Sequence, residues 1–224
     1  MKNIVSIGKH TEGRGDLKID IGRLIETRLL IQASSGGGKS MTLRTILENT
    51  FGKTPHIILD TEGEFSTLRE KYDYVLCGQG GDIPADPRTA QLLAQKMLEL
   101  NASIIIDLYE LKHLDRHRFV KLFLETLINA PKELWGPRLI VIDEAHQYCP
   151  EKGFGTSEAW ETVIELCEKG RKRGLGTILA TQRLSKLSKD AAAECQNKHR
   201  GQPEVLQSTR MLSHGAPCQS NGLA

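Results

Sequence analysis

The chain carries Ala33-Ser-Ser-Gly-Gly-Gly-Lys-Ser40 directly after a short apolar run at residues 28–31. A loop that binds phosphate needs glycines so that its backbone N–H groups can curl inward. It also needs a lysine to meet the β- and γ-phosphates and a Ser or Thr hydroxyl to hold Mg²⁺. Ala33 stands where the strict pattern has glycine, and a looser form of the pattern admits alanine there. We therefore expect nucleotide binding, with Ser40 also a metal ligand, by Ser35, Gly36, Gly37, Gly38, Lys39, Ser40 and Met41.

Short apolar runs alternate with helical stretches along the chain. The runs are rich in Ile, Leu and Val without alternation, which is typical of strands buried on both faces of a parallel sheet. They lie at residues 28–31, 56–59, 103–107, 139–142 and 177–180. The helical stretches lie at residues 41–49, 89–100, 115–128 and 157–173. This order predicts an α/β fold with a mainly parallel sheet, helices on both faces, and ligands at the carboxyl ends of the strands.

Two adjacent acids end one of the expected strands, in the segment Leu139-Ile-Val-Ile-Asp143-Glu144. Together with the glycine-rich loop, a buried strand that ends in two carboxylates indicates a P-loop ATPase. In such a site Asp143 orients the Mg²⁺ shell as a metal ligand, and Glu144 is the catalytic residue that polarises the attacking water. We expect ATP and Mg²⁺ as ligands and ATP hydrolysis as the reaction.

Two more polar segments follow expected strands at the same edge of the sheet. Gln182 comes after the run at 177–180 and is a candidate catalytic residue that senses the γ-phosphate or positions the water. A glutamine that merely caps a loop is the alternative. Asp60-Thr-Glu-Gly-Glu64 follows the run at 56–59. Its acids either help to hold metal or water, or are solvated turn residues.

Composition excludes several other classes of protein. Hydrophobic residues make up 39% of the chain and charged residues 26%, which is typical of a globular domain. The formal net charge of +2 indicates nucleic-acid binding only if Lys and Arg cluster locally. No apolar run approaches the ~20 residues of a membrane span, and no signal-peptide pattern is present. The scattered cysteines, five in number, favour free thiols, so we expect a cytoplasmic protein with no membrane partner.

The sequence divides into three parts. Residues 1–27 contain short alternating pieces, which predict a small β segment packed on the core. Residues 28–198 form the ATPase core. From residue 199 onward Gly, Pro, Gln and Ser dominate, so the tail at 199–224 is expected to be irregular or disordered.

Five segments resemble those of the HerA/FtsK group of hexameric DNA-pumping ATPases, and within it the HerA-like branch. They are Ser35-Gly-Gly-Gly-Lys-Ser40, Leu59-Asp-Thr-Glu-Gly-Glu-Phe65, Val141-Ile-Asp-Glu-Ala-His146, Gly170-Arg-Lys-Arg-Gly174 and Leu179-Ala-Thr-Gln-Arg183. The resemblance spans roughly residues 22–198. It implies a RecA-like fold, a homo-oligomeric ring of six subunits with ATP sites at the subunit boundaries, and DNA as a partner in translocation or unwinding. It also implies a catalytic role for Arg171, as an arginine finger that reaches the ATP of a neighbouring subunit.

Two features depart from the family pattern. Only about 28 residues precede the loop strand, where relatives carry a β-barrel, and Gly, Pro and Gln follow residue 198, where relatives continue with another strand. An alternative function therefore stays open, in which the chain is an ATP-dependent switch or assembly subunit of a phage or defence complex. It would then have a nuclease or defence effector as partner protein and would move no DNA. The surface that faces DNA, a neighbouring subunit or water would include Lys169, Arg171, Lys172, Arg173, Arg183, Lys186 and Lys189.

Overall fold

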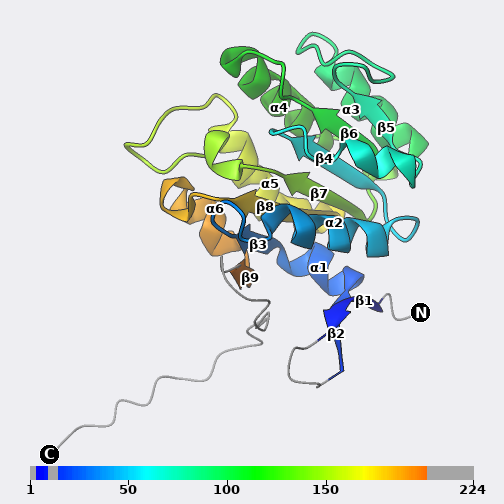
Figure 1. Ribbon diagram of the computed structural model, residues 1–224. Helices are drawn as coiled ribbons and strands as arrows, with labels where there is room; N and C mark the ends of the chain where they lie inside the picture. The colour runs from blue at the N-terminus through cyan, green and yellow to red at the C-terminus, as the bar shows by residue number, and fades with distance from the viewer. Residues whose placement is uncertain (1–3, 10–14, 201–224) are drawn as a thin grey trace, which may run out of the picture.

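Parallel strands form the central sheet of the protein (Figure 1). The computed structural model describes residues 4–9 and 15–200. In these residues the sheet has seven strands in the order β5-β6-β4-β7-β8-β3-β9, and every neighbouring pair is parallel. The strands are β3 (Leu29–Gln32), β4 (His56–Asp60), β5 (Val75–Cys77), β6 (Ile104–Asp107), β7 (Arg138–Ile142), β8 (Leu175–Thr181) and β9 (Asn197–Arg200). The predicted α/β fold with a parallel sheet is confirmed.

Helices cover both faces of this sheet, as predicted. Successive residues of a strand point to opposite faces, so Ile57 and Leu59 pack with α3, α4, α5 and α6, whereas Ile58 packs with α1 and α2. The helices are α1 (Ile21–Thr27), α2 (Lys39–Thr50), α3 (Ala90–Leu100), α4 (His113–Ile128), α5 (Trp160–Arg173) and α6 (Lys189–Glu194). Short 3-10 helices lie at η1 (Ser66–Glu70), η2 (Lys132–Leu134), η3 (Ala145–Gln147) and η4 (Leu184–Lys186).

The N-terminal segment contains both a hairpin and a helix. Strands β1 (Ile4–Lys9) and β2 (Asp16–Asp20) pair antiparallel, and Val5 and Ile19 are buried in the same cluster as α1 and α2. Residues 21–27 form α1, where only a β segment had been expected. Asp20 caps this helix by accepting the Arg23 N–H at 3.2 Å, which explains why the chain leaves the β conformation there.

The sheet continues past the expected end of the core. β9 pairs with β3 in parallel, with Lys198 opposite Leu30 and Arg200 opposite Gln32. The expected boundary between core and tail at residue 198 therefore falls inside a strand, which continues to Arg200. A backbone hydrogen bond holds the chain just before this strand, since Gln196 donates its N–H to Thr27 O at 3.0 Å. The rest of the predicted irregular tail, at 201–224, lies outside the described residues.

This strand order brings three carboxyl ends together. β8 lies between β3, which leads into the glycine-rich loop, and β7, which leads into the two acids. Residues that follow these strands therefore share one edge of the sheet. Across the described residues, the helices include none that is long and apolar enough to span a lipid bilayer.

Candidate nucleotide site

The glycine-rich loop joins the end of β3 to the start of α2. Gly36 and Gly38 have φ of 74° and 84°, in the left-handed region that favours glycine, and Gly38 is the N-cap of α2. Gly37 donates its N–H to Ser34 O at 2.8 Å, and a Cβ on Gly37 would lie 2.9 Å from that oxygen. The loop is therefore tightly curled, and it leads into the N-terminal N–H groups of α2, which have no partner within the helix.

The outer residues of the predicted nucleotide site lie on the surface. Ser35 is exposed on the loop, and Met41, in the first turn of α2, is 68% exposed. The Met41 side chain therefore faces solvent, and the group that this residue offers a phosphate is its backbone N–H.

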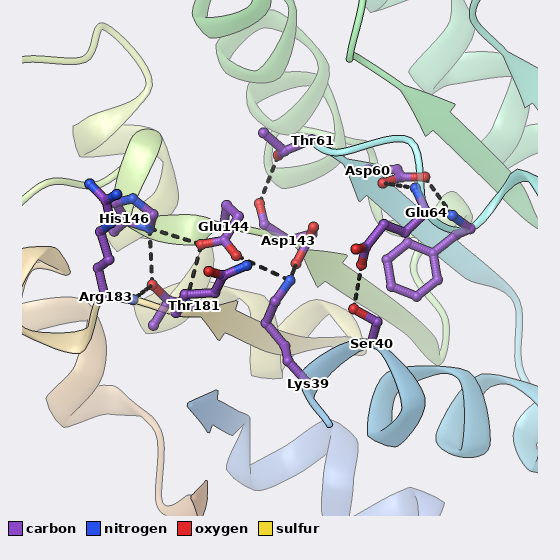
Figure 2. A network of polar contacts seen from close by, with 12 residues as sticks. Lys39, Ser40, Asp60, Thr61, Glu64, Asp143, Glu144, His146, Thr181 and Arg183 are labelled. Carbon is purple, nitrogen blue, oxygen red and sulfur yellow. Dashed lines mark hydrogen bonds and ion pairs between the residues drawn. The ribbon is translucent and has the colours of Figure 1, made fainter. Parts of the chain in front are cut away.

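A buried cluster of charges lies beside the loop (Figure 2). The Lys39 ammonium contacts a carboxylate oxygen of Asp143 and lies 3.2 Å from Glu144 Oε1. Each of these residues is at most 5% exposed. Buried charges of this kind are stable only when they are paired. The structure thus brings together the lysine of the loop and both acids that follow β7.

Burial and the ion pairs act against each other in this cluster. Burial alone would lower the pKa of Lys39, but Asp143 and Glu144 raise it above its ordinary value. For Asp143, burial outweighs the attraction of Lys39 and raises the pKa to about 7. For Glu144, burial is again the largest influence, yet His146, Lys39 and the Gln182 N–H together lower the pKa. Glu144 is therefore the more readily ionised of the two acids.

The Glu144 carboxylate is held by the chain segment that follows β8. Glu144 Oε2 accepts the Gln182 N–H at 3.2 Å and lies 3.1 Å from His146 Nδ1. His146 Nδ1 lies 3.0 Å from Thr181 Oγ1 as well (Figure 2). Gln182 thus contacts Glu144 through its backbone, while its side chain is exposed.

The turn after β4 reaches the loop from the other side. The Ser40 hydroxyl donates to a carboxylate oxygen of Glu64, and Arg44 donates to the Glu64 carbonyl oxygen. Asp60 accepts the N–H groups of Glu64 and Phe65 at 3.1 and 2.8 Å, and burial raises its pKa to about 6. Asp60 is therefore not a solvated turn residue, because it is fully buried and holds the turn. Glu62 is exposed, and Glu64 presents its carboxylate to Ser40.

The oxygen atoms of this cluster fit a magnesium ion. Asp143 Oδ2 is buried and accepts no hydrogen bond from the described residues, and the Ser40 hydroxyl is the second expected ligand. The described residues hold no group of three or more His, Cys, Asp or Glu side chains that could bind a metal by themselves. Mg²⁺ is commonly bound by one or two protein oxygens together with phosphate and water, which agrees with this sparse set.

Arg171 lies at the other end of the strands, where β8 begins. It is exposed in the last turn of α5, and its carbonyl accepts the Gly174 N–H at 3.1 Å, just before β8 begins. β8 runs parallel to β3, so the start of β8 and the loop after β3 are at opposite ends of these strands. Within one chain the structure does not bring Arg171 to Lys39.

Two residues of the cluster were not predicted from the sequence, namely His146 and Thr181. Each lies within a segment that carries the family resemblance, Val141–His146 or Leu179–Arg183, but neither was given a role in the site. Their meeting depends on the η3 turn after β7, for which the sequence contains no Gly or Pro signal.

A family model described as the central domain of helicase HerA matches residues 5–198. The chain belongs to this family. The match includes the glycine-rich loop, the two acids after β7 and the segments that contain Arg171 and Gln182. No curated protein matches the sequence.

Solved structures with a similar fold include a VirB4 protein, a genome packaging NTPase and a conjugation coupling protein. VirB4 of Thermoanaerobacter pseudethanolicus has a TM-score of 0.61 at 15% identity, over 89% of this chain and 84% of that one. The genome packaging NTPase B204 of Sulfolobus turreted icosahedral virus 2, in complex with ATP-gammaS, has a TM-score of 0.53 at 18% identity, over 79% and 74%. The pCW3 conjugation coupling protein TcpA has a TM-score of 0.53 at 17% identity, over 90% of this chain and 55% of that one. This HerA-family chain is therefore a P-loop ATPase domain by fold.

Proposed function

We propose that this chain binds and hydrolyses Mg-ATP as the motor subunit of a HerA-like hexameric DNA translocase or helicase. The observation that carries the proposal is the position of Lys39. This lysine directly follows the glycines of the loop and contacts both Asp143 and Glu144. Membership of the HerA family supports it, as does the packaging NTPase with this fold that was solved with an ATP analogue.

The residues of the cluster divide the work of hydrolysis in this proposal. The glycine loop and Lys39 bind the phosphates, and Ser40 and Asp143 hold Mg²⁺, which when bound would offset charge on the phosphate oxygens. Glu144 accepts a proton from the attacking water, whose oxygen forms a bond to the γ-phosphorus. The bond from that phosphorus to the leaving ADP oxygen breaks, which yields ADP and phosphate. Gln182 lies beside Glu144 and orients the water.

Two substitutions test the division between binding and chemistry. Lys39→Ala should raise the Kd for ATP about 10-fold or more, because the phosphates lose a charged partner. Glu144→Gln should bind ATP normally but hydrolyse it about 10²-fold more slowly, which is the scale of losing a general base. Nucleotide binding and steady-state hydrolysis are measured in parallel. Turnover at the wild-type rate in Glu144→Gln would remove this residue from the mechanism.

The DNA part of the proposal has a separate test. Lys189 has a side chain that is 88% exposed, and Lys186 lies 6.0 Å from the ring of Phe154 on the same surface. Lys186→Ala with Lys189→Ala should weaken DNA binding and reduce its salt slope by about 1–2. The control is Lys53→Ala with Lys96→Ala. Lys53 lies just after α2 and Lys96 lies on α3, and this double variant should keep the salt slope of DNA binding. Hydrolysis that DNA never stimulates, with an unchanged slope, would favour the switch or assembly subunit.

A further inference from the structure

His146 connects the proposed catalytic acid to a different strand of the sheet. Its Nδ1 lies 3.1 Å from Glu144 Oε2 and 3.0 Å from Thr181 Oγ1, and its side chain is 13% exposed. We infer that His146 is a positioning residue, which fixes Glu144 Oε2 so that Glu144 Oε1 is the oxygen that receives the proton of the attacking water. This inference rests on the proposed function, since it concerns the same acid.

The hydrogen-bond partners determine which nitrogen of His146 carries a proton. A carboxylate only accepts hydrogen bonds, so Nδ1 must be protonated to bond with Glu144 Oε2. Thr181 Oγ1 accepts the Arg183 N–H at 3.0 Å and lies within reach of the same His146 proton. The imidazole is therefore oriented from two sides, by the acid and by the end of β8.

The two oxygens of Glu144 have different surroundings. Oε2 has two donors, His146 Nδ1 and the Gln182 N–H at 3.2 Å. Oε1 is buried and accepts no well-aligned hydrogen bond from the described residues, and its contact is the ion pair with Lys39 at 3.2 Å. Lys39 is the group that phosphates would attract, so nucleotide binding would draw it away from Oε1 and leave Oε2 in place. A general base needs one free oxygen and a fixed orientation, and this division supplies both.

The backbone turn at Glu144 places the acid and its support close together in the chain. Glu144 has φ of 47° and ψ of 45°, a left-handed conformation that is uncommon for a residue other than glycine. Glu144 is the N-cap of η3 and His146 lies within η3, so this one turn brings the imidazole to the carboxylate. Thr181 and Gln182 then join this turn to the end of β8. Glu144 thus keeps one position relative to the segment that contains Gln182.

Three substitutions of His146 separate positioning from general stability. Asn places its amide where Nδ1 lies, Gln places its amide where Nε2 lies, and Ala removes both. We expect His146→Asn to keep most of the wild-type kcat for ATP hydrolysis. His146→Gln and His146→Ala should lose about 10- to 100-fold in kcat, which corresponds to one hydrogen bond to a charged group. The KM for ATP should stay within about 2-fold in all three, since phosphate binding lies with the loop.

A double substitution shows whether His146 acts through Glu144. In a Glu144→Gln background, His146→Ala should cause little further loss of kcat, because the group that it positions is already absent. Equal kcat in the Asn and Gln variants, an unchanged kcat in His146→Ala, or a full additional loss in the double variant would each overturn the inference. These results leave the proposed function standing if Glu144→Gln alone is slow. Fast turnover in Glu144→Gln would instead overturn both.

Discussion

At Gly37 a single hydrogen atom in place of a side chain sets the shape of the phosphate loop. An added Cβ would lie 2.9 Å from Ser34 O and 3.1 Å from Ala33 Cβ, so the backbone of the loop would have to move. We predict that Gly37→Ala raises the Kd for ATP by about 10-fold or more, because displaced N–H groups no longer converge on the phosphates. Titration of the folded variant with nucleotide measures the effect.

Gly136→Ala is the matched control for this substitution. A Cβ on Gly136 would meet Arg138 Nη1 at 3.6 Å, which is an ordinary van der Waals contact. Nucleotide affinity should therefore stay at the wild-type value. If Gly37→Ala bound ATP as tightly as Gly136→Ala, the tight curvature of the loop would not matter for binding.

Sequence and structure agree unevenly at the level of single residues. Lys39, Ser40, Asp143 and Glu144 could be selected from the sequence because their residue types and spacing follow phosphate and metal chemistry. The structure places Lys39 against Asp143 and Glu144 and pairs Ser40 with Glu64, while their roles in hydrolysis stay predictions. The contact of His146 with Glu144 could not be selected, because it depends on a positive φ at Glu144, and no local signal predicts that value for a non-glycine residue.

A buried histidine at the start of β4, close to the end of α2, makes the free energy of unfolding depend on pH. His56 begins β4, and its ring contacts Thr50 Oγ1 at 2.9 Å, at the end of α2, and the Tyr74 hydroxyl at 2.6 Å. Burial lowers the pKa of His56 to about 4 from its ordinary value of 6.5, so the folded protein keeps this ring neutral. Between these values the unfolded chain binds more protons than the folded one, so stability falls as the pH falls.

We predict that His56 alone removes about 2 kcal/mol of unfolding free energy between pH 7 and pH 5. His56→Gln lacks the titrating group, so its unfolding free energy should depend less on pH by that amount. Urea unfolding at the two pH values measures both proteins. The difference between wild type and variant is needed, because burial also lowers the pKa of His117 to about 4 and raises that of Asp60 to about 6. An identical pH dependence in both proteins would contradict the prediction.

Strands made of continuous apolar runs were predictable, whereas the three-residue strand β5 and the polar strand β9 were not. The five predicted strands match β3, β4, β6, β7 and β8, because continuous Ile, Leu and Val runs have few other uses in a globular domain. β5 covers only Val75–Cys77, and β9 (Asn197–Arg200) is a polar edge strand whose burial pattern is half exposed. Their place in the sheet comes from pairing with β6 and β3, which is tertiary information that no local pattern contains.

For the molecule as a whole, two predicted parts of the ATP site lie at opposite ends of the parallel strands. Lys39 follows the carboxyl end of β3, whereas Arg171 precedes the start of β8. An arginine at that end cannot act on the nucleotide of its own chain without unfolding α5. A ring in which the α5 end of one subunit meets the loop of the next would bring the two together, as the family resemblance implies.

We therefore predict that each active site is shared between two subunits. Arg171→Ala should bind ATP normally but hydrolyse it about 10³-fold or more slowly, the scale of losing an arginine finger. Lys172→Ala, the exposed neighbour in the same helical turn, is the control and should hydrolyse normally. Mixing Arg171→Ala with Lys39→Ala subunits should restore part of the activity, because one kind of interface then contains both Lys39 and Arg171. Mixed rings, verified by mass, that stay as inactive as their components would show that Arg171 does not act across the interface.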